Sequence, residues 1–163
     1  MSAVLKKSPL EVQRTIHEIL EHHAGVQGAL LPILHSIQDV LGYIPADSVS
    51  DIASALNLSR AEVHGVITYY HHFRMTMPGQ HIVKICRAEA CQSMGADALM
   101  AHAEKHLCCP AHHTTEDGVF SLEATYCLGL CASSPAISIN DEVHARVSTS
   151  DFNALIAEAR GQT

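Results

Sequence analysis

Four stretches in the first half of the chain repeat apolar residues with the period of an α-helix. The first follows Ser8-Pro9, a capping residue with a proline suited to the first helical turn, and the fourth follows Ser59-Arg-Ala-Glu62, a capping box. Glycines at positions 25, 28 and 42 interrupt the pattern. The inward faces consist of Val12, Ile16, Ile19 and Leu20; Leu30, Leu34, Ile37 and Leu41; Ile52, Ala53 and Leu56; and Val63, Val66, Ile67 and Tyr70. This pattern predicts a small bundle of four short helices.

After Pro78-Gly79 the period of the apolar positions changes from that of a helix to that of a strand, which predicts a domain boundary there. A short β-branched run leads to Cys86, and two later alternating stretches meet at Asn140-Asp141, a good hairpin turn. The predicted elements are strands over 81–85, 119–125, 136–140 and 142–147, with helices over 93–107 and 152–159. This order predicts an open four-stranded sheet flanked by helices. We therefore expect a helical bundle over residues 1–79 and an α/β domain over residues 80–163.

The composition of the 163 residues excludes several classes of function. Hydrophobic residues make up 47% of the chain, which is enough to bury a core, and the net charge is −7. A negative surface repels phosphates, and no Trp with only three Phe and four Tyr leaves few platforms for stacking bases. The start of the chain carries no secretory signal, and no apolar run is long enough to span a membrane. We expect a cytoplasmic protein that binds neither nucleic acid nor membrane.

Six cysteines in a reduced compartment favour metal or redox ligands over disulfides, which remain the minority interpretation. Four of them form the pairs Cys86-x4-Cys91 and Cys127-x3-Cys131. Each pair lies where a predicted strand ends, so the two segments can meet at one end of the sheet. Four converging thiolates can hold a tetrahedral zinc ion or an iron–sulfur cluster.

The spacing favours one of these two groups. Structural zinc usually takes Cys-x2-Cys pairs, whereas the wider gaps here suit ligands spread over the two irons of a 2Fe–2S cluster. Four thiolates, two sulfides and two ferric ions carry a charge of −2, and reduction makes it −3, so the cluster needs N–H donors close by. Gly129, between Cys127 and Cys131, lets the backbone approach the sulfurs. Zinc stays the alternative at this point.

The two cysteine pairs, with Cys-Leu-Gly-Leu-Cys-Ala-Ser-Ser-Pro at 127–135, resemble the thioredoxin-like 2Fe–2S ferredoxins. This family includes the 24 kDa subunit of respiratory complex I and subunits of NAD-linked hydrogenases and formate dehydrogenases. Gly42-Tyr-Ile-Pro45 and Val63-His-Gly-Val-Ile-Thr-Tyr-Tyr70 extend the resemblance over about residues 11–160. It implies a thioredoxin-like domain with one 2Fe–2S cluster, for which the ligands would be Cys86, Cys91, Cys127 and Cys131.

The residues next to the cysteines indicate which members of the family the chain resembles most. Tyr126 and Leu130 stand where complex I subunits usually have Glu and Ala. The strings at 86–95 and 126–135 look most like the gamma subunit of soluble NAD-dependent, molybdenum-containing formate dehydrogenases. That resemblance implies an oxidoreductase subunit for electron transport: its cluster exchanges electrons with a flavoprotein that binds FMN and NAD, and a larger molybdenum subunit oxidises formate. The N-terminal bundle of the family packs against the flavoprotein.

FMN, NAD and the molybdenum cofactor are therefore expected in partner subunits only, and no catalysis is expected from the isolated chain. The sequence contains neither Gly-x-Gly-x-x-Gly nor a Walker loop, so it should not bind NAD itself. Two alternatives stay open: the same module in an NAD-reducing hydrogenase or in complex I, and a structural zinc-binding adaptor.

The remaining cysteines lie near histidines, in His102-x3-His106-Leu-Cys108-Cys109. A second metal site is one interpretation, but adjacent cysteines rarely both bind one tetrahedral ion. We expect a polar helix face that runs into an exposed loop. We also expect Arg87 and Glu89 to be solvated loop residues, and hydrogen bonds from Ser133 and Ser134 to cluster or loop are plausible.

Overall fold

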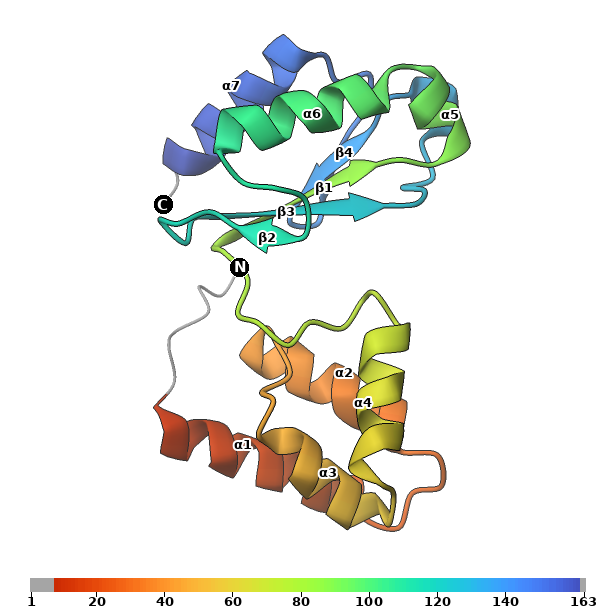
Figure 1. The fold of residues 1–163 in the computed structure, drawn as a ribbon, viewed down its shortest axis with the longest axis vertical. Coiled ribbons are helices and arrows are strands. Elements are labelled where there is room, and N and C mark those ends of the chain that lie inside the picture. Colours follow the sequence, from red (N-terminus) through yellow and green to blue (C-terminus); the bar gives the residue numbers. More distant parts are fainter. Residues whose placement is uncertain (1–7, 162–163) are drawn as a thin grey trace. The chain divides into compact units, whose positions relative to one another are not determined.

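The computed structural model describes residues 8–161, and its contacts divide the chain into two compact units, one ending at Met77 and the other beginning at Pro78. Figure 1 shows helices α1 to α4 in the first unit and a sheet with helices in the second. Residues 1–7, on which the absence of a secretory signal partly rests, lie outside the described residues. Within residues 8–161, no helix combines the length and the apolar character that a membrane crossing needs.

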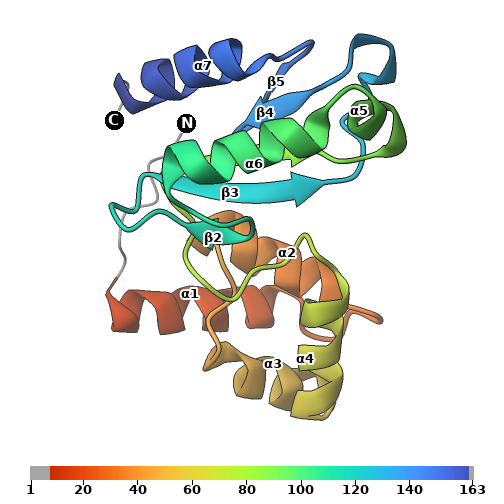
Figure 2. The same ribbon diagram turned by 45° about the horizontal axis from the view of Figure 1, so that its top comes forward.

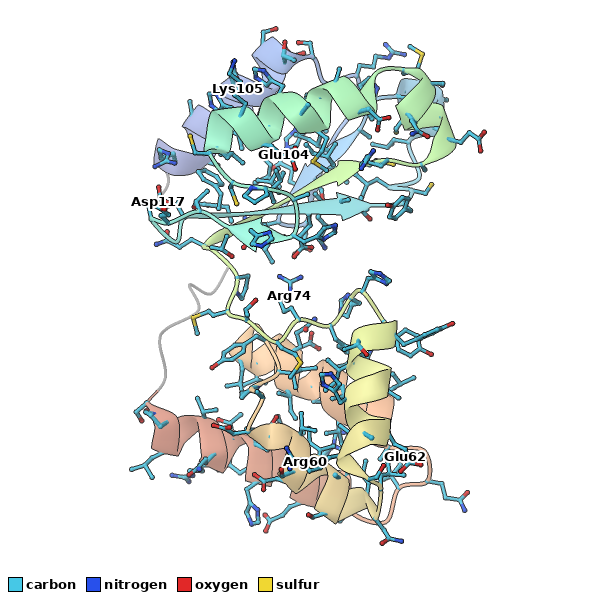
Figure 3. The ribbon with its side chains drawn as sticks, viewed as in Figure 1. Arg60, Glu62, Arg74, Glu104, Lys105 and Asp117 are labelled. Carbon is cyan, nitrogen blue, oxygen red and sulfur yellow. The ribbon has the colours of Figure 1, made fainter. Side chains whose placement is uncertain are left out.

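The first unit consists of α1 (Pro9–His22), α2 (Leu30–Leu41), α3 (Ser48–Leu56) and α4 (Arg60–Tyr69). Both predicted caps are confirmed: the Ser8 hydroxyl accepts from the Glu11 N–H, and the Ser59 hydroxyl accepts from the N–H of Glu62, which Figure 3 labels at the start of α4. Gly42 ends α2 in a left-handed conformation with φ 83°. Local capping chemistry therefore sets these boundaries.

Apolar side chains from all four helices form the core of the first unit, including Ile16, Ile37, Ile52 and Val63. The prediction that Tyr70 faces inward is wrong, because its side chain is 43% exposed. The helix ends at Tyr69, and the extended backbone of Tyr70 takes its side chain off the inward face.

The second unit is built around a five-stranded sheet in the order β2-β3-β1-β4-β5. Strands β1 and β3 are parallel, and the other neighbours are antiparallel. In chain order the elements are β1 (His81–Cys86), α5 (Glu89–Ser93), α6 (Ala96–Leu107), β2 (His113–Thr114), β3 (Phe120–Thr125), the 3-10 turn η1 (Cys131–Ser133), β4 (Ile137–Ile139), β5 (Glu142–His144) and α7 (Thr149–Gly161). The thioredoxin-like class predicted from the sequence agrees with this mixed fold.

Two details differ from the prediction of four strands and one continuous helix. The additional strand, β2, has only two residues, both exposed, so it carries no alternating pattern to detect. The helix predicted from residue 93 begins only at Ala96, after Gly95 with φ 92°, and a separate short helix, α5, precedes it at Glu89–Ser93. The hairpin at Asn140-Asp141 is confirmed, since Ile139 pairs with Glu142 across it.

Helices α6 and α7 lie on the same face of the sheet, as both views show (Figures 1 and 2). The core between them and the sheet contains Val83 and Ile85 of β1, Phe120 and Leu122 of β3, and Phe152 of α7. At the amino end of the sheet the chain approaches β3 so closely that a Cβ on Gly79 would lie 2.7 Å from the Phe120 carbonyl carbon. These contacts hold β1 beside β3, so the carboxyl ends of the two strands lie next to each other.

Candidate metal centre

Both cysteine pairs follow the carboxyl ends of the two parallel strands. Cys86 is the last residue of β1 and is paired in register with Thr125, the last residue of β3. Cys91 lies in α5, while Cys127 follows β3 by two residues and Cys131 opens η1. Because parallel strands end at the same edge of a sheet, the two segments that carry the cysteines start side by side.

The first pair is buried, with Cys86 and Cys91 each 2% exposed. Burial by itself raises the pKa of the Cys86 thiol. Hydrogen bonds from the Ala88 N–H and the Cys91 thiol lower it, as do those from the N–H groups of Cys127 and Leu128. The donors outweigh burial, and the pKa of Cys86 lies below its ordinary value. This sulfur therefore sits among groups that stabilise negative charge.

The second pair is exposed, and the Sγ atoms of Cys127 and Cys131 lie 3.8 Å apart. Cys127 has a left-handed φ of 93°, and the Gly129 N–H donates to its sulfur at 3.4 Å. The hydrogen bond with Cys127 and its charge raise the pKa of Cys131, and the charges of Cys91 and Cys86 raise it further. The neighbouring thiolates thus oppose the ionisation of Cys131, and a bound cationic group would offset that repulsion.

The geometry of the four thiols fits a binuclear cluster. The thiols lie as two pairs, since the Cys91 thiol forms a hydrogen bond with Cys86 and the Sγ atoms of Cys127 and Cys131 are 3.8 Å apart. Two thiolates for each iron are what a 2Fe–2S cluster requires. The backbone donors to Cys86 and Cys127 supply the hydrogen bonds that sulfur ligands of such a cluster accept.

An ion-paired network supports the first pair, and the sequence did not predict it. Arg87 donates to Oδ1 of Asp97 from Nη2 at 2.7 Å and from Nε at 3.1 Å. Gln92 donates to Oδ2 of the same carboxylate at 3.0 Å. Since Arg87 follows Cys86 and Gln92 follows Cys91, Asp97 links the residues next to both buried cysteines. Arg87 lies in a loop as expected, but its half-exposed side chain is ion-paired, and Glu89 is exposed as expected but opens α5 instead of lying in a loop.

Within residues 8–161, the other cysteines and histidines form no group of three or more that could hold a metal ion. Cys108 is exposed at the end of α6, whereas Cys109 is 2% exposed within the core, where burial raises its pKa. The His102 ring bonds to Asn153 Oδ1 through Nε2 at 2.8 Å and is stacked with the His106 ring, their centroids 5.8 Å apart. These rings belong to the packing of α6 against α7.

The family model described as thioredoxin-like [2Fe-2S] ferredoxin matches residues 16–160 of the chain. The NADP-reducing hydrogenase subunit HndA of Solidesulfovibrio fructosivorans is 28% identical over 92% of this chain and 88% of its own length. The NADH-quinone oxidoreductase subunit 2 of Thermus thermophilus is 29% identical over 83% of this chain and 76% of its own.

Among solved structures, an NAD+-reducing [NiFe]-hydrogenase in the air-oxidized state superposes with a TM-score of 0.67 at 25% identity. The match covers 82% of this chain and 23% of that one, so this chain spans about a quarter of the hydrogenase chain.

Proposed function

The chain belongs to the thioredoxin-like [2Fe-2S] ferredoxin family, whose cofactor is one 2Fe–2S cluster, and from this premise we propose that its two cysteine pairs hold the cluster and that the chain carries single electrons within an NAD-linked oxidoreductase complex. The proposed ligands are Cys86, Cys91, Cys127 and Cys131. The observation that supports this most directly is the meeting of two thiol pairs, with N–H donors, at one edge of the sheet. When bound there, the cluster supplies one-electron chemistry.

The two cysteine pairs have different roles at this edge of the sheet. Cys86 and Cys91 hold one side of the site in a buried, hydrogen-bonded position. Cys127 and Cys131 are exposed, and Tyr126 beside them is 73% exposed. A partner's redox group can therefore approach the site from the second pair, whereas the first pair lies away from solvent.

The proposed partner is a flavoprotein that binds FMN and NAD, and residues 1–79 would form the domain that docks it. An aromatic surface supports this role: Tyr69 is 74% exposed, and its ring contacts that of Tyr70 with centroids 5.0 Å apart. The rings of His35 and His72 continue the surface at a centroid distance of 5.0 Å. Exposed rings of this kind are enriched at protein interfaces.

We propose, at finer detail, that the complex is a soluble NAD-dependent formate dehydrogenase with a molybdenum-containing subunit. The residues between the ligands support it, namely the strings at 86–95 and 126–135 with Tyr126 and Leu130. The proposed site of action is the cytoplasm, with neither nucleic acid nor membrane as a partner.

A second candidate is the same role in an NAD-linked hydrogenase. It is favoured by the similarity of this chain to a hydrogenase subunit over 92% of its length.

Purification of the complex from the native host, through a tag on this chain, separates the two candidates. We expect a flavoprotein and a molybdenum subunit to co-purify, and formate to reduce the complex anaerobically. Recovery of a nickel–iron subunit, with reduction by hydrogen and not by formate, would overturn the formate proposal and leave the electron-transfer role in place. A matched preparation with Cys108→Ser should yield the same subunits, because that thiol is exposed and outside the proposed ligand set.

A further inference from the structure

A buried hydroxyl joins the two cysteine segments. Ser134 is 9% exposed, and its Oγ lies 3.4 Å from the Cys91 Sγ. The same hydroxyl donates to the carbonyl oxygen of Cys131 at 2.9 Å. Ser134 therefore contacts one cysteine through its sulfur and another through its backbone, and these two cysteines come from different pairs.

The direction of the hydrogen bond between Cys91 and Ser134 must reverse when a metal is bound. In the thiol form, Cys91 donates its proton to the Ser134 oxygen. A cysteine that ligates iron is a thiolate and has no proton, so its sulfur can only accept. The 3.4 Å contact can then persist as a hydrogen bond only if the single proton of the Ser134 hydroxyl, which here goes to the Cys131 carbonyl, turns to the Cys91 sulfur or is shared between the two acceptors. Cys91 is 2% exposed, so water has little access to replace this donor.

We infer that Ser134 is a positioning residue that tunes the reduction potential of the centre by donating its hydroxyl hydrogen bond to the Cys91 sulfur. The inference rests on the proposed ligand set. An added electron increases the negative charge on the cysteine sulfurs, so a donor to sulfur stabilises the reduced form more than the oxidised form. One electron enters in this step, and no covalent bond to Ser134 forms or breaks.

Ser133 provides a matched control one residue away. It is half-buried, and its side chain makes no hydrogen bond to any of residues 8–161, although its N–H donates to the Leu130 carbonyl. Replacement of Ser133 by Ala removes the same atom from the same turn without removing a donor to sulfur. A difference between the two alanine variants therefore reports the hydrogen bond and not the loss of a hydroxyl in general.

The test is an anaerobic redox titration of the full chain carrying its cluster, followed by EPR, for the wild type, Ser134→Ala, Ser134→Thr and Ser133→Ala. For Ser134→Ala we expect the ratio of reduced to oxidised protein at a fixed potential to fall roughly tenfold, which is a shift of about 59 mV to lower potential for a one-electron couple. Ser134→Thr, which keeps the hydroxyl, and Ser133→Ala should titrate close to the wild type.

The outcomes separate this inference from the function on which it rests. The inference would be overturned if Ser134→Ala had the same reduction potential as Ser133→Ala, or if the potential of Ser134→Thr were lowered as much as that of Ser134→Ala. Either result would leave the proposed cluster unaffected. If Ser134→Ala retained no cluster, retention at the wild-type potential in Ser134→Thr would support the requirement for the hydroxyl, and loss in both would overturn it. A wild-type chain without iron and sulfide would instead overturn the proposed function.

Discussion

The two cysteine pairs meet at one edge of the sheet, but they are built differently. Cys86 and Cys91 lie in a strand and a helix, are 2% exposed, and are supported by the network around Asp97. Cys127 and Cys131 lie in an exposed connection with no strand or helix between them, where the backbone at Cys127 and Gly129 is left-handed. The first pair is thus fixed by regular structure, and the second depends on the conformation of a short loop.

This difference assigns separate tasks to the two sides of the proposed centre. In the proposed centre the buried pair, held by hydrogen bonds, would anchor the cluster, whereas the exposed pair would present it to a partner. Redox centres need both, because rigidity limits rearrangement on reduction and exposure limits the distance to the partner.

Loss of a ligand from either pair should abolish the centre. We expect Cys86→Ser and Cys127→Ser each to lose most of the iron and acid-labile sulfide of the purified chain, since both irons of the cluster need their thiolates. Cys108→Ser should keep both, because Cys108 is exposed at the end of α6. Iron and sulfide assays check this, and equal loss in all three variants would show that the ligand set is wrong.

Chemical labelling of the protein after removal of iron should distinguish the pairs by their exposure. We expect iodoacetamide to modify Cys127 and Cys131 at least roughly ten times faster than Cys86 and Cys91, because access to the sulfur outweighs the lowered pKa of Cys86 and the raised pKa of Cys131. Mass spectrometry of peptides over time measures the rates, with exposed Cys108 as the internal reference. Faster labelling of Cys86 would refute the contrast between a buried and an exposed pair.

The loop of the second pair should be sensitive to its backbone. Gly129 has φ 80°, and nothing lies within 4 Å of the place where a Cβ would stand, so Gly129→Ala adds strain but no clash. A left-handed alanine costs about 1–2 kcal/mol, and we expect iron release to a chelator to become roughly tenfold faster.

Gly118→Ala is the control for this loop. Gly118 is also left-handed, with φ 70° and open space around it, but it lies in the turn between β2 and β3. It should lower the free energy of unfolding without changing iron release. Faster release in both variants would mean that general instability, and not the loop, controls retention.

Removal of the ion pair beside the first cysteines should have the smallest effect. The Arg87 and Asp97 side chains are 36% and 50% exposed, and exposed ion pairs contribute little to stability, so Asp97→Asn should speed iron release by no more than about fivefold. Asp117→Asn removes a comparable ion pair to Arg160 in the β2–β3 turn, where Figure 3 labels Asp117, and should leave the release rate unchanged. A release rate in Asp97→Asn equal to that of Asp117→Asn would show that the network does not support the cysteines.

Features that depend on neighbouring residues could be predicted from the sequence, whereas those that depend on tertiary contacts could not. Caps at Ser8 and Ser59 and the hairpin at Asn140-Asp141 were predictable because a few neighbouring residues decide them. Strand β2 was not, because two exposed residues have no periodicity. Gly95 was visible in the sequence as a glycine, but only its left-handed conformation shows that it separates two helices.

The candidate site follows the same division. The spacing of the four cysteines and their places after strands indicated the pairs, and the structure brings both to one edge of the sheet. The supporting groups are separated from their partners along the chain: Asp97 is 10 residues from Arg87, and Ser134 is 43 residues from Cys91. No spacing rule connects such residues, so only the packed fold shows their contacts.

Analysis of the chain purified without oxygen shows whether its two cysteine pairs hold a 2Fe–2S cluster. We predict a brown protein with two iron and two acid-labile sulfide per chain, and an EPR signal of one unpaired electron after reduction. A colourless protein with one tightly held zinc and no sulfide would contradict the claim and leave a structural adaptor in its place.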